Sequence, residues 1–146
     1  MIHRLEFSID IQANKSTIWK ALWDDHAYRQ WAGVFFKGSY IVCSDWQEGN
    51  IIQFLGPDQN GIYSKIETHH PNDIIQFRHL GNVVNGEEQP IDEETKKWSG
   101  ATEIYKLIEG DGSNTLHIEI DVMDEHLEFM KNTFPQALEK IKSNCA

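Results

Sequence analysis

The chain has 146 residues, of which 40% are hydrophobic and 25% are charged, a balance typical of globular proteins. A chain of this length is expected to form one domain, residues 1–146, whose core needs no disulfide or metal. The formal net charge is −10, and the 13 basic residues are scattered among 23 acidic ones. This pattern excludes the clustered cationic surface of a nucleic-acid-binding protein, so no nucleic acid partner is expected.

Signals for targeting and for redox chemistry are weak. Polar residues follow Met1 closely, and the chain contains no run of about 18 apolar residues. We therefore expect no signal peptide and no insertion into a membrane. Cys43 and Cys145 lie far apart without metal-like spacing, and two such thiols favour a reducing compartment, so we expect a cytoplasmic protein.

The first elements are a strand and two short helices. Residues 3–11 alternate between apolar and polar side chains, which predicts a half-buried strand. Asn14 is the expected N-cap of a helix whose apolar stripe includes Ile18 and Trp23. A second short helix is expected over residues 24–31, ending before Gly33.

Period-two alternation then returns and predicts six further strands. They lie at residues 36–45, 51–55, 62–70, 74–80, 101–109 and 115–123. Short turns rich in Gly, Asn, Asp and Pro separate most of them, which is typical of antiparallel neighbours. The exception is a long polar loop at residues 81–100, a length that favours a functional or mobile segment such as a pocket lid.

The last element is a long helix. Apolar residues recur at spacings of three and four, which gives one buried stripe of Leu127, Met130, Phe134, Leu138 and Ile141. Asp124 is the expected N-cap of this helix. An interior proline removes a backbone hydrogen bond, but the stripe keeps its phase across Pro135, so we expect one bent helix.

The order of these elements predicts an α+β fold. One antiparallel sheet of about seven strands, curved by its own twist, is expected to wrap around the long C-terminal helix. The two short helices would lie between the first and second strands.

Several short motifs carry a resemblance to a known family. Their positions are residues 18–22 (IWKAL) with Trp31, residues 45–49 (DWQEG), residues 98–105 with 112–116, and residues 134–142. In this order they resemble the START-like (SRPBCC) superfamily, in the AHSA-type branch named after the heat-shock-protein-90 ATPase activator homologues. Lys15 departs from the branch, which commonly has proline at the start of the first helix.

The resemblance implies a helix-grip fold with a cavity for a small hydrophobic molecule such as a lipid. For some members of the branch it implies a stress response or the regulation of a chaperone. The branch has no universal catalytic residues, so the resemblance assigns none to this chain.

The aromatic residues favour the same cavity, because five tryptophans are many for one small domain. We expect the ligand-binding cavity to be lined by Trp31, Trp46, Phe54, Tyr63, Phe77, His79, Trp98, Glu103, Tyr105, Met130 and Phe134. The alternative is that these rings only fill the core.

His79 and Glu103 each share a strand face with apolar neighbours, so both could point into the cavity. There they could perform acid–base chemistry, or they could form a buried hydrogen-bonded pair. No phosphate-binding loop or nucleophile elbow occurs, and no cofactor is expected.

The seven histidines do not show the spacing of a metal site. His117 and Glu119 share one strand face, which is expected to point to solvent, so no metal is expected. The favoured function is binding of a small hydrophobic molecule without catalysis. A chaperone-regulating interaction module and a cyclase- or dehydratase-like enzyme stay open as alternatives.

Overall fold

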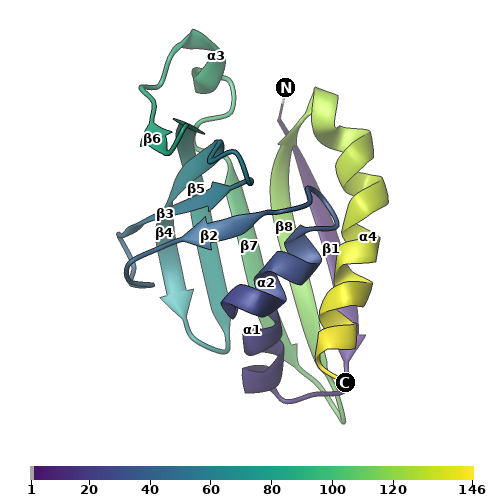
Figure 1. Ribbon diagram of the computed structural model, residues 1–146. Helices are drawn as coiled ribbons and strands as arrows, with labels where there is room; N and C mark the ends of the chain where they lie inside the picture. Colours follow the sequence, from purple (N-terminus) through teal and green to yellow (C-terminus); the bar gives the residue numbers. More distant parts are fainter. Residues whose placement is uncertain (1) are drawn as a thin grey trace.

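The computed structural model describes residues 2–146 and shows an antiparallel sheet that curves around a long C-terminal helix (Figure 1). The 8-stranded sheet has the strand order β1-β8-β7-β5-β4-β3-β2, and β6 pairs with β5. The helices α1, α2 and α4 lie on one side of it, over its concave face (Figure 1). The predicted α+β helix-grip architecture is therefore confirmed.

The outer part of the sheet beside the long helix is made by the first and last strands. β1 (Ile2–Ile11) runs antiparallel to β8 (Asn114–Met123) over its whole length, from the pair Ile2↔Met123 to Ile11↔Asn114. Alternate residues of β1, among them Phe7, pack towards the core, because successive side chains of a strand point to opposite faces.

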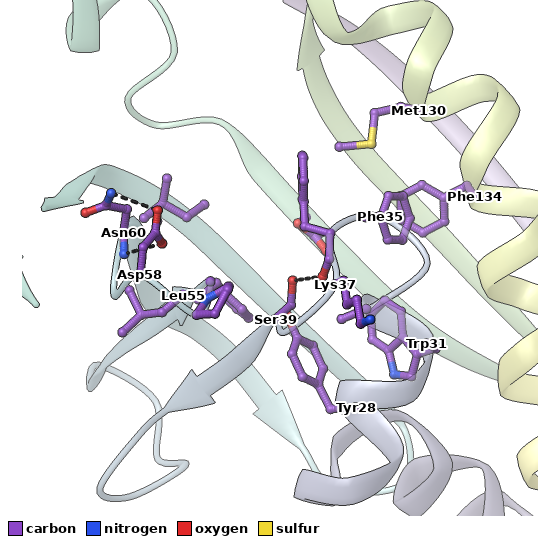
Figure 2. Close-up of a pocket in the computed structure, with 18 of the residues that line it drawn as sticks. Tyr28, Trp31, Phe35, Lys37, Ser39, Leu55, Asp58, Asn60, Met130 and Phe134 are labelled. Atoms are coloured by element: carbon purple, nitrogen blue, oxygen red, sulfur yellow. Dashed lines mark hydrogen bonds between the residues drawn. The ribbon is translucent and has the colours of Figure 1, made fainter. Parts of the chain in front are cut away.

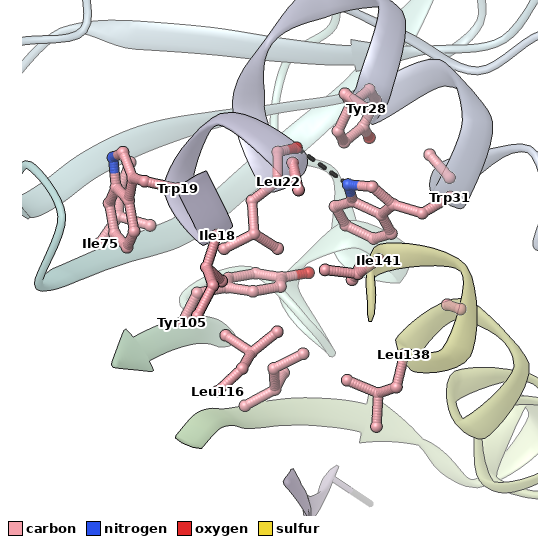
Figure 3. Packing of buried hydrophobic residues seen from close by; sticks show 14 of the residues in the cluster. Ile18, Trp19, Leu22, Tyr28, Trp31, Ile75, Tyr105, Leu116, Leu138 and Ile141 are labelled. Atoms are coloured by element: carbon pink, nitrogen blue, oxygen red, sulfur yellow. Dashed lines mark hydrogen bonds between the residues drawn. The ribbon is translucent and has the colours of Figure 1, made fainter. Parts of the chain in front are cut away.

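A hydrogen bond in the core joins the two short helices. The Asn14 side chain accepts a hydrogen bond from the Thr17 amide at 2.8 Å and starts α1 (Lys15–Trp23) as predicted. α2 (Asp25–Ala32) follows at once. Within the core, the Trp31 indole donates to the Leu22 carbonyl at 2.9 Å, which fixes the angle between the two helices (Figure 3).

The strand predicted at residues 36–45 is wrong for most of its length. β2 covers only Tyr40–Val42, at the sheet edge beside β3 (Ile51–Leu55). The preceding residues form turns, with Gly38 at φ 88°, a left-handed conformation that cannot continue a strand. Residues 33–39 therefore form turns and do not join the sheet.

The loop predicted at residues 81–100 is partly ordered. β4 (Gly61–His70) pairs with β5, which extends from Ile74 to Val84, beyond the predicted end at residue 80. Asn85 and Gly86, at φ 52° and 82°, turn the chain into β6 (Glu87–Glu88), as expected for an Asn-Gly hairpin. The short helix α3 (Glu93–Lys96) follows before β7 (Thr102–Glu109).

The C-terminal helix α4 (Leu127–Asn144) runs without interruption across Pro135, so the prediction of a single helix is correct. The predicted N-cap at Asp124 is wrong, because a 3-10 turn, η1 (Asp124–His126), comes first and the Asp124 side chain pairs with His3 instead. Among the described residues, no helix has the length and apolar character needed to cross a membrane.

The core lies between the concave face of the sheet and the three longer helices (Figure 3). Phe134, Leu138 and Ile141 of the predicted α4 stripe are almost fully buried, and Leu127 and Met130 are half-buried. The stripe therefore packs tightly at the C-terminal end of α4 and less tightly at its N-terminal end. The candidate site occupies the region beside this less tightly packed end.

Candidate functional site

A pocket with a volume of about 690 Å³ opens between α2, the segment that follows it, the β3–β4 hairpin and the first half of α4 (Figure 2). Most of the lining is apolar. The lining residues are Trp23, Tyr28, Trp31, Ala32, Phe35, Phe36, Lys37, Ser39, Phe54, residues 55–58 and 60–62, Glu103, Tyr105, Met130 and Phe134.

One wall is built from rings of the short helices. The Tyr28 and Trp31 rings meet edge to face with centroids 5.0 Å apart, and Trp23 meets Tyr105 in the same way at 4.9 Å. Such contacts stabilise aromatic pairs beyond the area they bury, so this wall is held in place before any ligand arrives.

The opposite wall comes from α4 and the segment after α2. Phe134 stacks on Phe7 of β1 at 4.7 Å and meets Phe35 edge to face at 4.8 Å. Met130, one turn earlier, points towards the pocket (Figure 2). This wall depends on the turns at residues 33–39, which place Phe35 against the helix; the strand predicted from residue 36 onwards does not form there.

A chain of polar side chains lies on the sheet side of the pocket. Within this chain, Glu103 accepts a hydrogen bond from the Tyr105 hydroxyl. The other oxygen of Glu103 lies 3.2 Å from His79 Nε2, and His79 Nδ1 lies 2.6 Å from the Ser64 hydroxyl. Ser64, His79 and Tyr105 are almost fully buried, whereas Glu103 is half-buried and faces the pocket.

Two tyrosines beside Glu103 are held in their neutral form. Burial raises the pKa of Tyr28 well above its ordinary value, and the nearby Glu103 carboxylate raises it further. Burial and the same carboxylate also raise the pKa of Tyr105. Both phenols therefore keep their protons at neutral pH and can act as hydrogen-bond donors.

The mouth of the pocket is polar. Asp58 in the β3–β4 hairpin accepts hydrogen bonds from the Asn60 amide at 3.1 Å and from its side chain at 3.0 Å (Figure 2). Ser39 donates to the Phe36 carbonyl at 2.6 Å, and Lys37 extends beside it. These contacts shape both edges of the mouth.

The structure brings part of the predicted lining set together. Its members that line the pocket are Trp31, Phe54, Glu103, Tyr105, Met130 and Phe134. His79 stands behind Glu103, and Phe77 is fully buried behind Phe54, whose ring lies 5.1 Å away. Both face the same side as the pocket but do not line it.

Three other residues of the predicted set lie elsewhere. The Tyr63 hydroxyl donates to the Gln89 carbonyl at 2.8 Å, and its ring covers Gly81 so closely that an added Cβ would lie 2.7 Å from it. Trp46 packs beside His69 outside the pocket, and Trp98 lies in the turn that follows α3. None of these three lines the pocket.

Several lining residues were missed by the sequence analysis. Trp23 was assigned to the apolar stripe of the first helix, and Tyr28 of the second helix was not singled out, because helical periodicity does not separate a core ring from a pocket ring. Phe35 and the β3–β4 hairpin approach the site only through the tertiary fold. For Phe35, Gly33 and Gly38 were the available signal that the chain turns there.

A second group of titratable residues lies on the other face of the sheet. Glu6, His117 and Glu119 place their ligand atoms within 4.8 Å of one another. His117 Nε2 lies 3.2 Å from Glu6, and Arg4 pairs with Glu119 at 3.4 Å. Each of these three side chains thus has a hydrogen-bonding or ion-pair partner within the protein.

Comparison with known proteins identifies the fold. No protein-family model and no curated protein matches the sequence. Solved structures do match. The Aha1 dimer from Colwellia psychrerythraea has a TM-score of 0.67 and 16% identity, over 96% of this chain and 93% of that one. Ara h 8.0201 has a TM-score of 0.64 and 11% identity, over 99% and 98% of the two chains.

DynU16, from the dynemicin biosynthetic locus, has a TM-score of 0.66 and 13% identity over 96% of this chain, which spans only 46% of DynU16. Identities this low establish a shared fold and leave the function open. The Aha1 and Ara h 8.0201 structures share the fold that the resemblance of the sequence motifs implies, over nearly the whole of this chain.

Proposed function

We propose that this protein binds a small hydrophobic molecule in the pocket between α2, the β3–β4 hairpin and α4. One observation carries the proposal, namely a pocket of about 690 Å³ whose lining is mostly apolar and includes eight aromatic residues. Pockets for small ligands commonly measure about 300–1,000 Å³ and combine apolar walls with a few polar groups. The resemblance of the sequence motifs to the START-like (SRPBCC) superfamily implies a cavity for such a molecule, which supports the same function.

The energetics of the walls favour a ligand. Transfer of apolar surface from water into such a pocket gains roughly 25 cal/mol per Å². The rings of Tyr28, Trp31 and Phe134 already pack against other side chains, so little ordering is needed on binding.

Two free thiols, Cys43 and Cys145, are compatible with a cytoplasmic site of action.

The neutral fluorescent probe N-phenyl-1-naphthylamine tests the proposal. We expect its emission to rise on binding, and tryptophan emission to fall, because Trp23 and Trp31 line the pocket. Met130→Trp should weaken binding at least about tenfold, since the larger ring occupies space that the probe needs.

Gln136→Trp is the matched control, because it places the same ring on the exposed face of the same helix. Its affinity for the probe should equal that of the wild type. Equal binding by the Met130 variant, or no binding by any form of the protein, would show that the pocket is not the binding site.

A cyclase- or dehydratase-like activity is a second candidate, favoured by one observation. The Glu103 carboxylate faces the pocket and pairs with His79 at 3.2 Å, an arrangement suited to proton transfer. Native mass spectrometry of the purified protein would identify a bound molecule. Incubation of that molecule with wild type and with Glu103→Gln would then reveal whether it is converted.

A further inference from the structure

Two polar groups that line the pocket, Tyr28 and Glu103, have unused hydrogen-bonding capacity, and the Glu103 carboxylate is close enough to raise the pKa of Tyr28. Tyr28 lines the pocket and is 8% exposed, yet its hydroxyl makes no hydrogen bond within residues 2–146. The hydroxyl is not one of the fully enclosed polar atoms of the described residues, so it is open to the pocket, where a ligand group can form a hydrogen bond with it. Glu103 is the second group.

Hydrogen-bonding partners within the protein fix the orientation of the Glu103 carboxylate. Tyr105 donates to one oxygen, and His79, itself in contact with Ser64, lies 3.2 Å from the other. An ionised carboxylate has about four acceptor positions, so these contacts leave room for further donors on the pocket side. Glu103 therefore offers a ligand fixed acceptor positions and a negative charge.

The Tyr28 hydroxyl offers the complementary function. Burial and the Glu103 carboxylate keep this phenol protonated, so it can donate a hydrogen bond. Its ring is held by Trp31 at 5.0 Å and by Trp23 at 6.3 Å, which restricts where the hydroxyl can point.

We propose that the ligand is a neutral, apolar ring compound with a hydroxyl group, which donates a hydrogen bond to Glu103 and accepts one from Tyr28. A hydroxyl group satisfies both residues at once, because it is a donor and an acceptor. The aromatic walls take the rest of the molecule. This inference rests on the proposed function and specifies the class of ligand.

The same two residues discriminate against other amphiphiles. A carboxylate ligand, such as a fatty acid whose head group enters the pocket, would bring a second negative charge beside Glu103. A ketone can accept from Tyr28 but has no proton for the carboxylate. An ammonium group can donate to Glu103 but has no lone pair for the Tyr28 proton.

Four probes with one ring system test the proposal: naphthalene, 2-naphthol, 2-naphthoate and 1-naphthylmethylammonium. Their affinities can be measured at pH 7 by quenching of tryptophan emission and by calorimetry. A hydrogen bond to a charged group should make 2-naphthol bind about tenfold more tightly than naphthalene. The carboxylate probe should bind more weakly than naphthalene, because its charge is repelled by Glu103.

Variants of the two residues separate recognition from a structural role. Glu103→Gln removes the charge at constant shape, so it should reduce the advantage of 2-naphthol and raise the affinity for 2-naphthoate about tenfold. This gain would not follow from mere loss of structure. Tyr28→Phe should weaken 2-naphthol binding several-fold and leave naphthalene binding unchanged. Tyr63→Phe, outside the pocket, is the matched control and should change neither affinity.

The outcomes distinguish this inference from the proposed function. If naphthalene binds as tightly as 2-naphthol, the pocket binds apolar ligands and the hydroxyl inference is wrong. Tighter binding of the ammonium probe than of 2-naphthol would also overturn it. If no probe binds, the proposed function itself fails. If Glu103→Gln does not fold, the order of the probe affinities for the wild type and for Tyr28→Phe still tests whether the pocket recognises a hydroxyl group.

Discussion

Single residues hold the sheet together where its strands must meet, and Asp121 of β8 is the clearest case. One oxygen of Asp121 accepts from Arg4 of β1 at 2.7 Å. The other accepts from the amide of Thr102 at 2.9 Å and from its hydroxyl at 3.1 Å, at the start of β7. One carboxylate thus links three strands.

These contacts make the stability depend on pH. Burial raises the pKa of Asp121, but the hydrogen bonds and charge of Arg4 and the bonds from Thr102 outweigh it, so the pKa lies below the ordinary 3.8. The stabilisation is therefore complete above about pH 4 and is lost as the pH falls through the lowered value.

Asp121→Asn should destabilise the protein by about 1–2 kcal/mol at pH 7, a moderate loss because Arg4 is largely solvent-exposed. Urea unfolding between pH 7 and pH 3 measures the difference from wild type, which should shrink below pH 4. Asp111→Asn, in the exposed β7–β8 turn, is the control and should change stability by less than about 0.5 kcal/mol. A difference that stays constant with pH would contradict the assignment.

At the scale of elements, α4 supplies both the core and the pocket wall. Its C-terminal half packs fully through Leu138 and Ile141, whereas Met130 is half-buried beside the open space. Phe134 lies between the two regions, with Phe7 on one side and Phe35 on the other.

Phe134→Ala should lower the free energy of unfolding by about 3–5 kcal/mol, because it leaves a cavity in contact with two other rings. Phe129→Ala is the control on the same helix. Phe129 is 40% exposed and meets Phe35 and Phe36 only at its buried side, with centroids 6.3 and 5.7 Å away, so the cost should be smaller, about 1–2 kcal/mol. Chemical denaturation of both variants measures the difference, and equal costs would mean that the buried face of α4 has been assigned incorrectly.

At the scale of the whole molecule, the two faces of the sheet have different chemistry. The concave face is apolar and encloses the pocket, whereas the outer face carries charged pairs such as Arg4 with Glu119. The pocket and the cluster of Glu6, His117 and Glu119 are therefore on opposite sides of one sheet.

Removal of metal ions should leave the protein intact. Because Glu6 pairs with His117 and Glu119 with Arg4, we expect dialysis against EDTA to leave the Tm unchanged. A thermal melt before and after dialysis, with Zn²⁺ added back as a control, is the measurement. A drop of several degrees that Zn²⁺ restores would show that the cluster holds a structural ion.

Most of the fold could be predicted from the sequence, because a half-buried element carries its own periodicity. Residues 3–11 alternate with a period of two, and the α4 stripe recurs every three or four positions, so each element shows which of its faces is buried. The inward direction of His79 and Glu103 followed from the same rule. Where local signals compete, as in the turns around Gly38 and the hairpin at Asn85, the prediction was wrong.

Only the tertiary structure decided which of these faces meet and where they leave a space. Tyr28, Phe35 and Glu103 belong to segments far apart in the chain, and the periodicity of each segment does not show that these three residues line one pocket. Their approach depends on sheet curvature and on the path of residues 33–39, which are properties of many long-range contacts together. A pocket is the volume that such packing leaves unfilled, and no local pattern encodes an unfilled volume.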